Sequence, residues 1–98
     1  MEVRAIAGET SWMSPMTGRD SASISVSGVA GTDYWPYLRD VHTTLAEFDG
    51  RGHWGKLHLM DTEQLAATYP RFHDFVELRR SLDLDAVFLN DHLAALLT

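Results

Sequence analysis

The feature that most constrains the fold of this chain is a change in the spacing of its apolar residues after residue 31. In residues 21–28, Ala22, Ile24 and Val26 alternate with serines, a period of two that is typical of a half-exposed β-strand. Residues 1–8 alternate in the same way, and the polar stretch 14–20 supplies turn residues between the two segments. We therefore predict strands near 1–8 and 21–29. They are expected to pair as an antiparallel sheet with one apolar face, in a register that so long a loop does not fix.

Beyond residue 33 the apolar residues recur at helical spacing. Residues 34–48 are predicted to form a helix that ends at the glycine-containing stretch 49–52. Two further helices are predicted near 62–68, with Thr62 as N-cap, and near 70–82, opened by Pro70. A turn is expected from Asp83 to Ala86, and Asn90 is expected to cap a last short helix. The side chains predicted to face inward are Tyr34, Leu38, Val41, Leu45, Phe48, Phe72, Phe75, Val76 and Leu82.

Because the strands come first and the helices follow, the predicted fold class is α+β. The 98 residues allow one small domain or a part of a larger one. A chain of this length buries only about 60–65% of the surface that it exposes when unfolded, so its stability margin is thin.

Composition excludes several classes of function. The net charge is −6, Lys56 is the only lysine and there is no basic cluster, which argues against a nucleic-acid partner. No apolar run approaches the length of a membrane helix, and no secretion signal opens the sequence, so we expect no membrane partner and a cytoplasmic location. The absence of cysteine excludes disulfides, thiolate metal sites and cysteine nucleophiles.

The residues alone show no complete catalytic apparatus. There is no nucleophile elbow and no glycine-rich phosphate loop. The five histidines lack the spacing of metal ligands, so no metal site is predicted. These histidines are His42, His53, His58, His73 and His92.

Two local features carry charge or aromatic surface. Glu2 and Arg4 are two apart on a predicted strand, so both head groups can reach one small molecule; a plain exposed ion pair is the simpler explanation of this spacing. The segment from His53 to Lys56 places a tryptophan beside the only ammonium group of the chain. It suits a ligand-contacting loop or a connector with a buried tryptophan, and the residues alone leave both open.

These features belong to an ordered series of motifs. The chain carries, in this order, Glu2-Val3-Arg4, Trp12 to Pro15, His53 to His58, Leu65, Tyr69 to Phe72, Asp74-Phe75, Arg79, Leu82-Asp83 and Phe88 to Asn90. The series resembles the carboxy-terminal stretch of the flavin-dependent sugar-alcohol and aldonolactone oxidases of the vanillyl-alcohol-oxidase type. That family includes alditol (xylitol), gulonolactone and D-arabinono-1,4-lactone oxidases, and the series resembles alditol oxidase in particular.

The resemblance implies that this chain works as part of a larger oxidase. Residues 1–60 resemble the end of the cap, or substrate, domain, and residues 61–98 resemble a helical tail that packs on the FAD domain. That domain would come from the same or another chain, with FAD as cofactor and a polyol or sugar lactone as substrate. The implied reaction converts a hydroxyl to a carbonyl, with oxygen as the final acceptor. Without the FAD domain, the chain is expected to expose apolar surface and to self-associate.

The resemblance also assigns roles to individual residues. Arg4 and Lys56 correspond to the family's cations beside the substrate and are the candidate catalytic residues. Glu2 and Ser27, together with these cations, are the candidate substrate-binding residues. His53 corresponds to a family residue near the isoalloxazine ring, and Asn90 belongs to the tail segment that packs beside the FAD domain; both are the candidate cofactor-binding residues.

Two departures from the family pattern stand beside these matches. Gly52 replaces a usual proline, and the turn from Asp83 to Ala86 lacks the family's proline and glycine. Both changes put the local backbone geometry in question. They favour an alternative function, in which the chain is an inactive remnant or a small stand-alone binding or interaction module with the cap fold.

Overall fold

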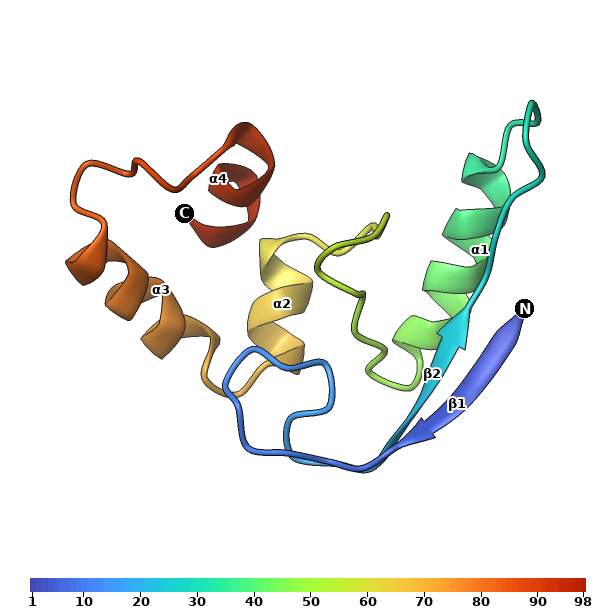
Figure 1. The fold of residues 1–98 in the computed structure, drawn as a ribbon, viewed down its shortest axis with the longest axis horizontal. Helices are drawn as coiled ribbons and strands as arrows, with labels where there is room; N and C mark the ends of the chain where they lie inside the picture. The colour runs from blue at the N-terminus through green and yellow to red at the C-terminus, as the bar shows by residue number, and fades with distance from the viewer.

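The computed structural model describes all 98 residues and confirms the α+β prediction (Figure 1). Two strands come first and four helices follow, with the longest helix at 12 residues. None of the helices combines the length and the hydropathy that crossing a bilayer requires. The elements are β1 (Glu2–Ile6), β2 (Ser21–Ser25), α1 (Trp35–Ala46), α2 (Thr62–Thr68), α3 (Phe72–Leu82) and α4 (Asp91–Leu97).

The two strands pair antiparallel, as predicted, but both are shorter than the ranges 1–8 and 21–29. In their register Glu2 lies opposite Ser25, and Arg4 lies opposite Ser23. The ladder ends after Ile6 because the next residues form their own loop; the backbone N–H of Gly8 donates to the Asp20 carboxylate rather than to a strand partner. The apolar face of this two-stranded sheet is uncovered.

Residues 7–20, here called the hairpin loop, form a folded connection. Glu9 and Thr17 form an isolated bridge, with the Glu9 N–H donating to Met16 at 3.1 Å and the Gly18 N–H donating to Glu9 at 2.9 Å. The Glu9 carboxylate also accepts hydrogen bonds from Ser14 and Ser11, which lower its pKa. The loop is therefore fixed to the start of β2 and the end of β1 by its own hydrogen bonds.

The helix α2 begins with a capping box, and its N-cap is Asp61 rather than the predicted Thr62. Asp61 has extended backbone, its carboxylate accepts from the Gln64 N–H at 2.8 Å, and the Gln64 side chain accepts from the Asp61 N–H at 3.2 Å. Thr62 instead donates to the Ala95 carbonyl at the end of α4. The predicted cap at Asn90 is confirmed, since its side chain accepts from the Leu93 N–H at 2.8 Å.

Two aromatic or aliphatic side chains predicted to face inward are exposed. Phe48 is 71% exposed because α1 ends at Ala46, so Phe48 lies beyond the helix and does not continue its apolar face. Leu82 is 77% exposed because it borders an apolar groove that no other part of this chain covers. The third helix begins at Phe72 rather than at Pro70, since the residues before it form a turn.

The hydrophobic core gathers in the second half of the chain. Its members come from α2, α3, α4 and the segments next to α2, and none precedes Met60: Met60, Leu65, Tyr69, Phe72, Val76, Leu96 and Leu97. The first half meets this core through the partly buried side chains of Met13 and Trp54, and polar contacts supply the other connections.

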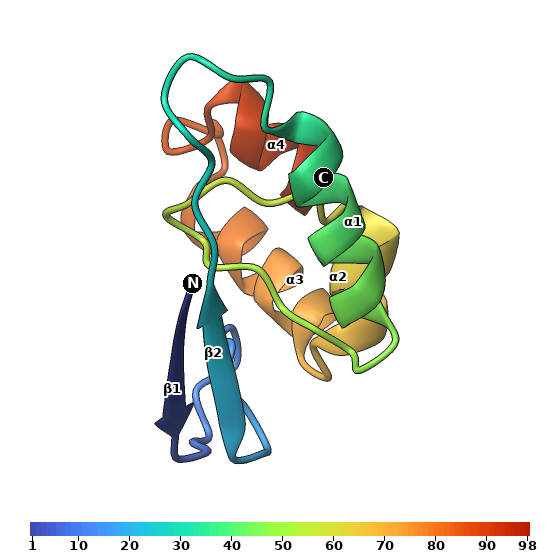
Figure 2. The same ribbon diagram turned by 90° about the vertical axis from the view of Figure 1, so that its right-hand side faces the viewer.

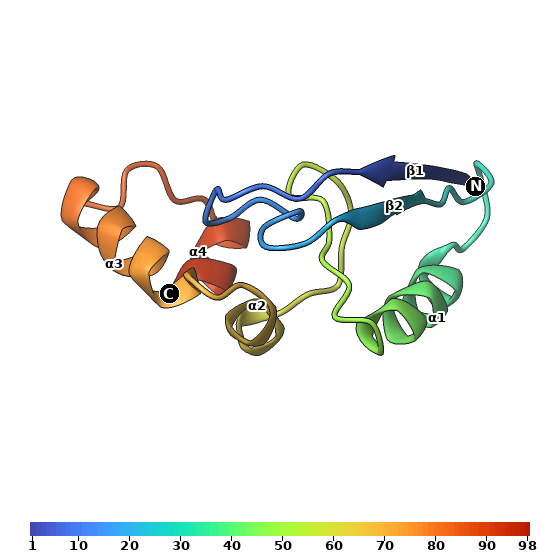
Figure 3. The same ribbon diagram turned by 90° about the horizontal axis from the view of Figure 1, so that it is seen from below.

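The molecule is flat and open, with extents of 41 × 32 × 18 Å. Its radius of gyration is 14.8 Å, against about 12.6 Å for a compact domain of this length. Figure 2 shows the strands extending away from the helices, and Figure 3 shows the strands and the hairpin loop along one side of the molecule with α1 and α2 on the other. The accessible surface of 7099 Å² exceeds the value for a self-standing protein of this mass by about 1,500 Å².

The turn that departs from the family pattern is well formed around Asp83. Its carboxylate accepts from the N–H groups of Val87 at 2.7 Å and Phe88 at 3.1 Å, and the Ala86 N–H donates to the Asp83 carbonyl. Ala86 has a φ of 54°, a left-handed conformation that costs an alanine about 1–2 kcal/mol. The turn is thus closed by its own hydrogen bonds and carries local strain where a glycine would carry none.

This strain leads to a stability prediction. Ala86→Gly should raise the free energy of unfolding by about 0.5–1 kcal/mol, because relief of the strain exceeds the added entropy of the unfolded chain. The matched control Ala67→Gly, on the exposed face of α2, should lower it by about 0.5–1 kcal/mol. Urea unfolding followed by tryptophan fluorescence measures both, and a loss of stability in Ala86→Gly would show that the left-handed turn is not strained.

Candidate functional site

Glu2 and Arg4 project from the same face of β1 and contact each other. The Arg4 Nε donates to the Glu2 carboxylate, while 71% of the Arg4 side chain and 55% of the Glu2 side chain stay exposed. An ion pair with this exposure stabilises the fold by about 0–1 kcal/mol. The pair is therefore free to rearrange around a bound molecule at little cost to the fold.

The serines of β2 share the face of the sheet that carries this pair. Antiparallel partners point to the same side, so Ser25 and Ser23 stand next to Glu2 and Arg4. Ser27, the predicted hydroxyl contact, is exposed and lies beyond the end of β2, two residues after the partner of Glu2. Sequence patterning could have found the two paired serines only if the register had been known.

Lys56 lies in the segment of residues 50–60, here called the Trp54 loop. Its side chain is exposed, and no ion pair or side-chain hydrogen bond of the structure joins it to Glu2 or Arg4. The Lys56 N–H donates to the His53 carbonyl at 3.1 Å, and the Gly55 N–H donates to the His53 ring at 3.0 Å, so the tip of the loop is a tight turn. The structure thus holds the three predicted charged residues on two separate elements.

Arg51, which the sequence did not single out as a site residue, connects the Trp54 loop to two other segments. Its guanidinium donates to the Thr68 carbonyl at 3.0 and 2.5 Å, to the Thr17 carbonyl at 2.8 Å and to the Pro15 carbonyl at 3.1 Å. Burial, and then the neighbouring Arg19, lower its pKa, but a guanidinium stays charged in proteins and can donate all four of these hydrogen bonds.

Aromatic side chains pack beneath Arg51. The ring of Tyr69 is fully buried, with the Arg51 guanidinium carbon 4.7 Å from its centroid and the Trp54 ring 5.8 Å away. Burial raises the pKa of the Tyr69 hydroxyl. The Trp54 indole N–H donates to the Met13 carbonyl at 2.9 Å, a second connection between the Trp54 loop and the hairpin loop. Trp54 is half-buried and packs against the core, and both predictions for its loop, a ligand-contacting loop and a connector with a buried tryptophan, stay open.

The second family departure, Gly52, fits its surroundings here. A Cβ added at this position would lie 2.7 Å from the Cβ of His58, and the Gly52 N–H contacts the Met60 sulfur at 3.1 Å. A proline at this position would lose that N–H and collide with His58. The close approach of His58 therefore requires a residue without a Cβ at position 52.

His58 is half-buried, and neither nitrogen of its imidazole has a hydrogen-bond partner. Both ring nitrogens are shielded, and the ring lies 5.4 Å from that of His92 and 6.2 Å from that of Trp54. Burial is the main cause that lowers its pKa, followed by repulsion from His92 and His42. No group of three or more histidine and acidic side chains in the structure has the arrangement of a metal site.

His53 and Asn90, the two residues predicted to lie by the cofactor, both use part of their side chains for local hydrogen bonds. The His53 ring is exposed and uses Nδ1 to accept from Gly55, while Asn90 uses its oxygen to cap α4, so each keeps one side-chain nitrogen for another partner. The N-termini of α2 and α4 are capped by their own side chains, and no segment forms a phosphate cradle.

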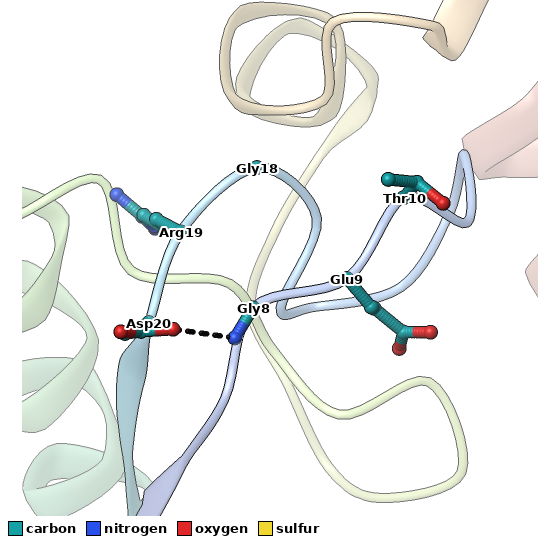
Figure 4. Close-up of a pocket in the computed structure, with 6 residues that line it drawn as sticks. All are labelled: Gly8, Glu9, Thr10, Gly18, Arg19 and Asp20. Carbon is teal, nitrogen blue, oxygen red and sulfur yellow. Dashed lines mark hydrogen bonds between the residues drawn. The ribbon is translucent and has the colours of Figure 1, made fainter.

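Neither of two hollows in the surface is lined by a predicted site residue. One, of about 350 Å³, is an open polar depression of the hairpin loop (Figure 4). Figure 4 also shows the Glu9 carboxylate turned to the side away from Asp20. The other, of about 330 Å³, is an apolar groove between α3, α4 and the turn that joins them. It is lined by Phe75, Leu78, Arg79, Leu82, Asp83, Phe88, Leu89, Leu93 and Leu97.

The chain belongs to the D-arabinono-1,4-lactone oxidase family, whose sequence model matches residues 1–96. It is 39% identical over 92 residues to an L-gulono-1,4-lactone dehydrogenase of Mycobacterium tuberculosis and 38% identical over 97 residues to an alditol oxidase of a Streptomyces species. The L-gulonolactone oxidase of mouse is 33% identical over 102 residues. These matches cover 94%, 98% and 95% of this chain but only 22%, 23% and 22% of the respective relatives, so the chain spans less than a quarter of their length.

The environment of His58 leads to a prediction on pH. The unfolded chain binds a proton near the ordinary pKa of 6.5, whereas the folded chain resists protonation of His58. The unfolded state therefore binds more protons below about pH 6.5, and the free energy of unfolding should fall as the pH drops through this range. His58→Phe, which keeps a ring against Trp54, should reduce this fall.

Urea unfolding at about pH 7.5 and about pH 5.5 measures the effect. The control His73→Phe removes an exposed histidine of α3 and should leave the pH dependence as it is. Equal pH dependence in His58→Phe and the unchanged chain would mean that His58 takes up its proton as readily in the folded state.

Proposed function

We propose that this chain is the substrate-binding segment of an FAD-dependent oxidase that converts a hydroxyl of a polyol or aldonolactone to a carbonyl. The observation that carries this proposal is the family match over residues 1–96, together with Glu2, Arg4 and Lys56 at the positions that the family resemblance assigns to substrate contact. The exposure of these three side chains supports it, since each can reach a ligand without disturbing the core.

The chemistry of the reaction fits these residue types. Removal of the hydroxyl proton leaves negative charge on the substrate oxygen, and fixed cations stabilise that charge. Arg4 and Lys56 are the cations in question, and Arg4 stands on a strand whose partner is fixed in register. FAD, when bound, would accept a hydride from the carbon that carries this hydroxyl and would pass the electrons on to oxygen.

Orientation of the substrate falls to the polar groups beside the cations. A polyol needs several hydrogen-bond partners to present one hydroxyl, and Glu2 and Ser27 supply acceptors near the start of β1. The Glu2 carboxylate is paired with Arg4 in the absence of substrate, which keeps both groups on one face of the sheet.

We also propose that the rest of the oxidase covers the open surfaces of this chain. The accessible surface exceeds that of a self-standing protein by about 1,500 Å², which is of the order that a stable protein interface buries. The uncovered sheet belongs to residues 1–60, the proposed end of the substrate domain. The apolar groove of α3 and α4 belongs to residues 61–98, the proposed tail on the FAD domain, from the same or another chain.

A chimera tests the assigned cations. In it, residues 1–98 replace the matching segment of the Streptomyces alditol oxidase, which is 38% identical to them. Lys56→Met and Arg4→Ala should each slow reduction of the flavin by xylitol by about 10²–10³, because each removes a preorganised cation from the developing oxyanion. Anaerobic stopped-flow absorbance measures this step, which oxidases and dehydrogenases share.

The control is Arg39→Met, which removes an exposed cation of α1 and should leave the reduction rate unchanged. If the chimera binds FAD and both Lys56→Met and Arg4→Ala are reduced at the unchanged rate, the residue assignment is wrong. A flavin-loaded chimera that xylitol cannot reduce would favour the remnant or binding-module function instead.

The uncovered groove leads to a prediction on association. The isolated chain should self-associate, and Phe88→Ser should weaken this association because Phe88 lines the groove and is 82% exposed. The control Val29→Ser changes an exposed apolar residue elsewhere and should have little effect. Sedimentation velocity over a concentration series measures the change, and a monomer at every concentration would contradict the prediction.

A further inference from the structure

Arg51 has a position in the structure that its place in the sequence does not explain. Three of its nitrogens reach three carbonyls that lie 17, 34 and 36 residues away along the chain. Two of these carbonyls, of Pro15 and Thr17, belong to the hairpin loop, and the third, of Thr68, closes α2. One planar group therefore joins the Trp54 loop, the hairpin loop and the helical core.

The contacts restrict the direction of the loop as well as its position. A guanidinium donates in the plane of a rigid fork, so carbonyls on several sides fix its orientation. The ring of Tyr69 lies beneath the same plane at 4.7 Å and is itself fully buried in the core. Arg51 is thus held in three dimensions, and the residues that follow it start from a fixed point.

Lys56 lies five residues after this point, and the intervening chain has little freedom. The Trp54 indole donates to the Met13 carbonyl at 2.9 Å, and the turn that begins at His53 is closed by the N–H groups of Gly55 and Lys56. The backbone position of Lys56 therefore follows from the contacts of Arg51 and Trp54.

The other end of the connection leads to Glu2 and Arg4. Thr17 forms a bridge with Glu9, and the Gly8 N–H donates to Asp20, so the hairpin loop is fixed to the strands next to it. The contact between Arg51 and Thr17 thus relates two rigid parts, one with Lys56 and one with the Glu2–Arg4 pair.

We propose that Arg51 is a positioning residue of the substrate site, which sets the place of Lys56 relative to the strand that carries Glu2 and Arg4. This role rests on the proposed function, since it matters for turnover only if these side chains bind one substrate. Arg51 acts through Lys56 and contacts no substrate itself. A lysine at position 51 would keep the positive charge and lose the fork that holds the loop.

The test is a double-mutant cycle in the chimera with the alditol oxidase. Arg51→Lys should slow flavin reduction at saturating xylitol, per bound flavin, by about 10- to 100-fold, since displacement of a catalytic group by about 1 Å costs on the order of 10² in rate. In the Arg51→Lys background, Lys56→Met should cost much less than it does alone, because the ammonium is already misplaced. If Arg51 served stability alone, Arg51→Lys would lower the flavin content and the melting temperature. Its effect on the rate per flavin would then simply add to that of Lys56→Met.

Arg80→Lys is the control. Arg80 is an exposed arginine of α3 whose side chain makes no hydrogen bond or ion pair with another segment of the chain. The control should leave the rate per flavin unchanged and should be additive with Lys56→Met.

Trp54→Phe keeps the test decisive if Arg51→Lys does not bind flavin. It removes only the indole donor to Met13 and should lower the rate per flavin several-fold, with the same coupling to Lys56→Met. Suppose that Lys56→Met alone is slow, but these variants are reduced at the normal rate per flavin, or their effects simply add to that of Lys56→Met. This result would overturn the role of Arg51 and leave the proposed function standing. Unchanged rates in both Lys56→Met and Arg4→Ala would overturn the proposed function, and the role of Arg51 with it.

Discussion

The packing of Arg51 on Tyr69 is the contact on which the arrangement of the whole chain depends. Tyr69 is fully buried among residues of α2, α3 and α4, whereas every residue before Met60 lies outside the core. Hydrogen bonds from a charged donor contribute about 1.5–3 kcal/mol each, and Arg51 makes them to Pro15, Thr17 and Thr68. With Trp54, Arg51 thus attaches the strand-bearing half of the molecule to the half that contains the core.

The second property of this fold is that large surfaces remain uncovered, because the strands lie apart from the half that contains the core. The strands pair with each other and with nothing else, and the apolar groove of α3 and α4 has no cover within the chain. A protein whose relatives are more than four times as long can leave such surfaces open, since the remaining domain covers them in the proposed assembly. The charged side chains of Glu2, Arg4 and Lys56 are likewise exposed in this chain.

Sequence patterns predicted those parts of the fold that depend on local interactions. The α+β order, the pairing of the two strands, the bounds of α2 and the cap at Asn90 follow from periodicity and short-range hydrogen bonds. The cap at Thr62 is wrong by one residue, although the spacing of Asp61 and Gln64 already carried the signature of a capping box. Leu82 matches its helical pattern and is nevertheless exposed, because the pattern states which face is apolar but not whether this chain contains the partner.

The candidate site depended on the resemblance more than on the pattern. Glu2 and Arg4 do share a face, as their spacing predicted, yet nothing in the spacing relates them to Lys56. Arg51 was missed because its partners are backbone carbonyls that are distant in the sequence, and a carbonyl has no signature in the sequence. Its place between two glycines before a tryptophan was the only local indication.

The most direct test of this account is a crystal structure of the chimera with xylitol bound in front of the flavin. The account predicts that the Arg4 guanidinium and the Lys56 ammonium each lie within hydrogen-bond distance, about 3 Å, of hydroxyls of the same xylitol molecule. It also predicts that Arg51 keeps its contacts to Thr17 and Thr68. A xylitol molecule bound in reach of the flavin, but in contact with neither Arg4 nor Lys56, would contradict the central claim.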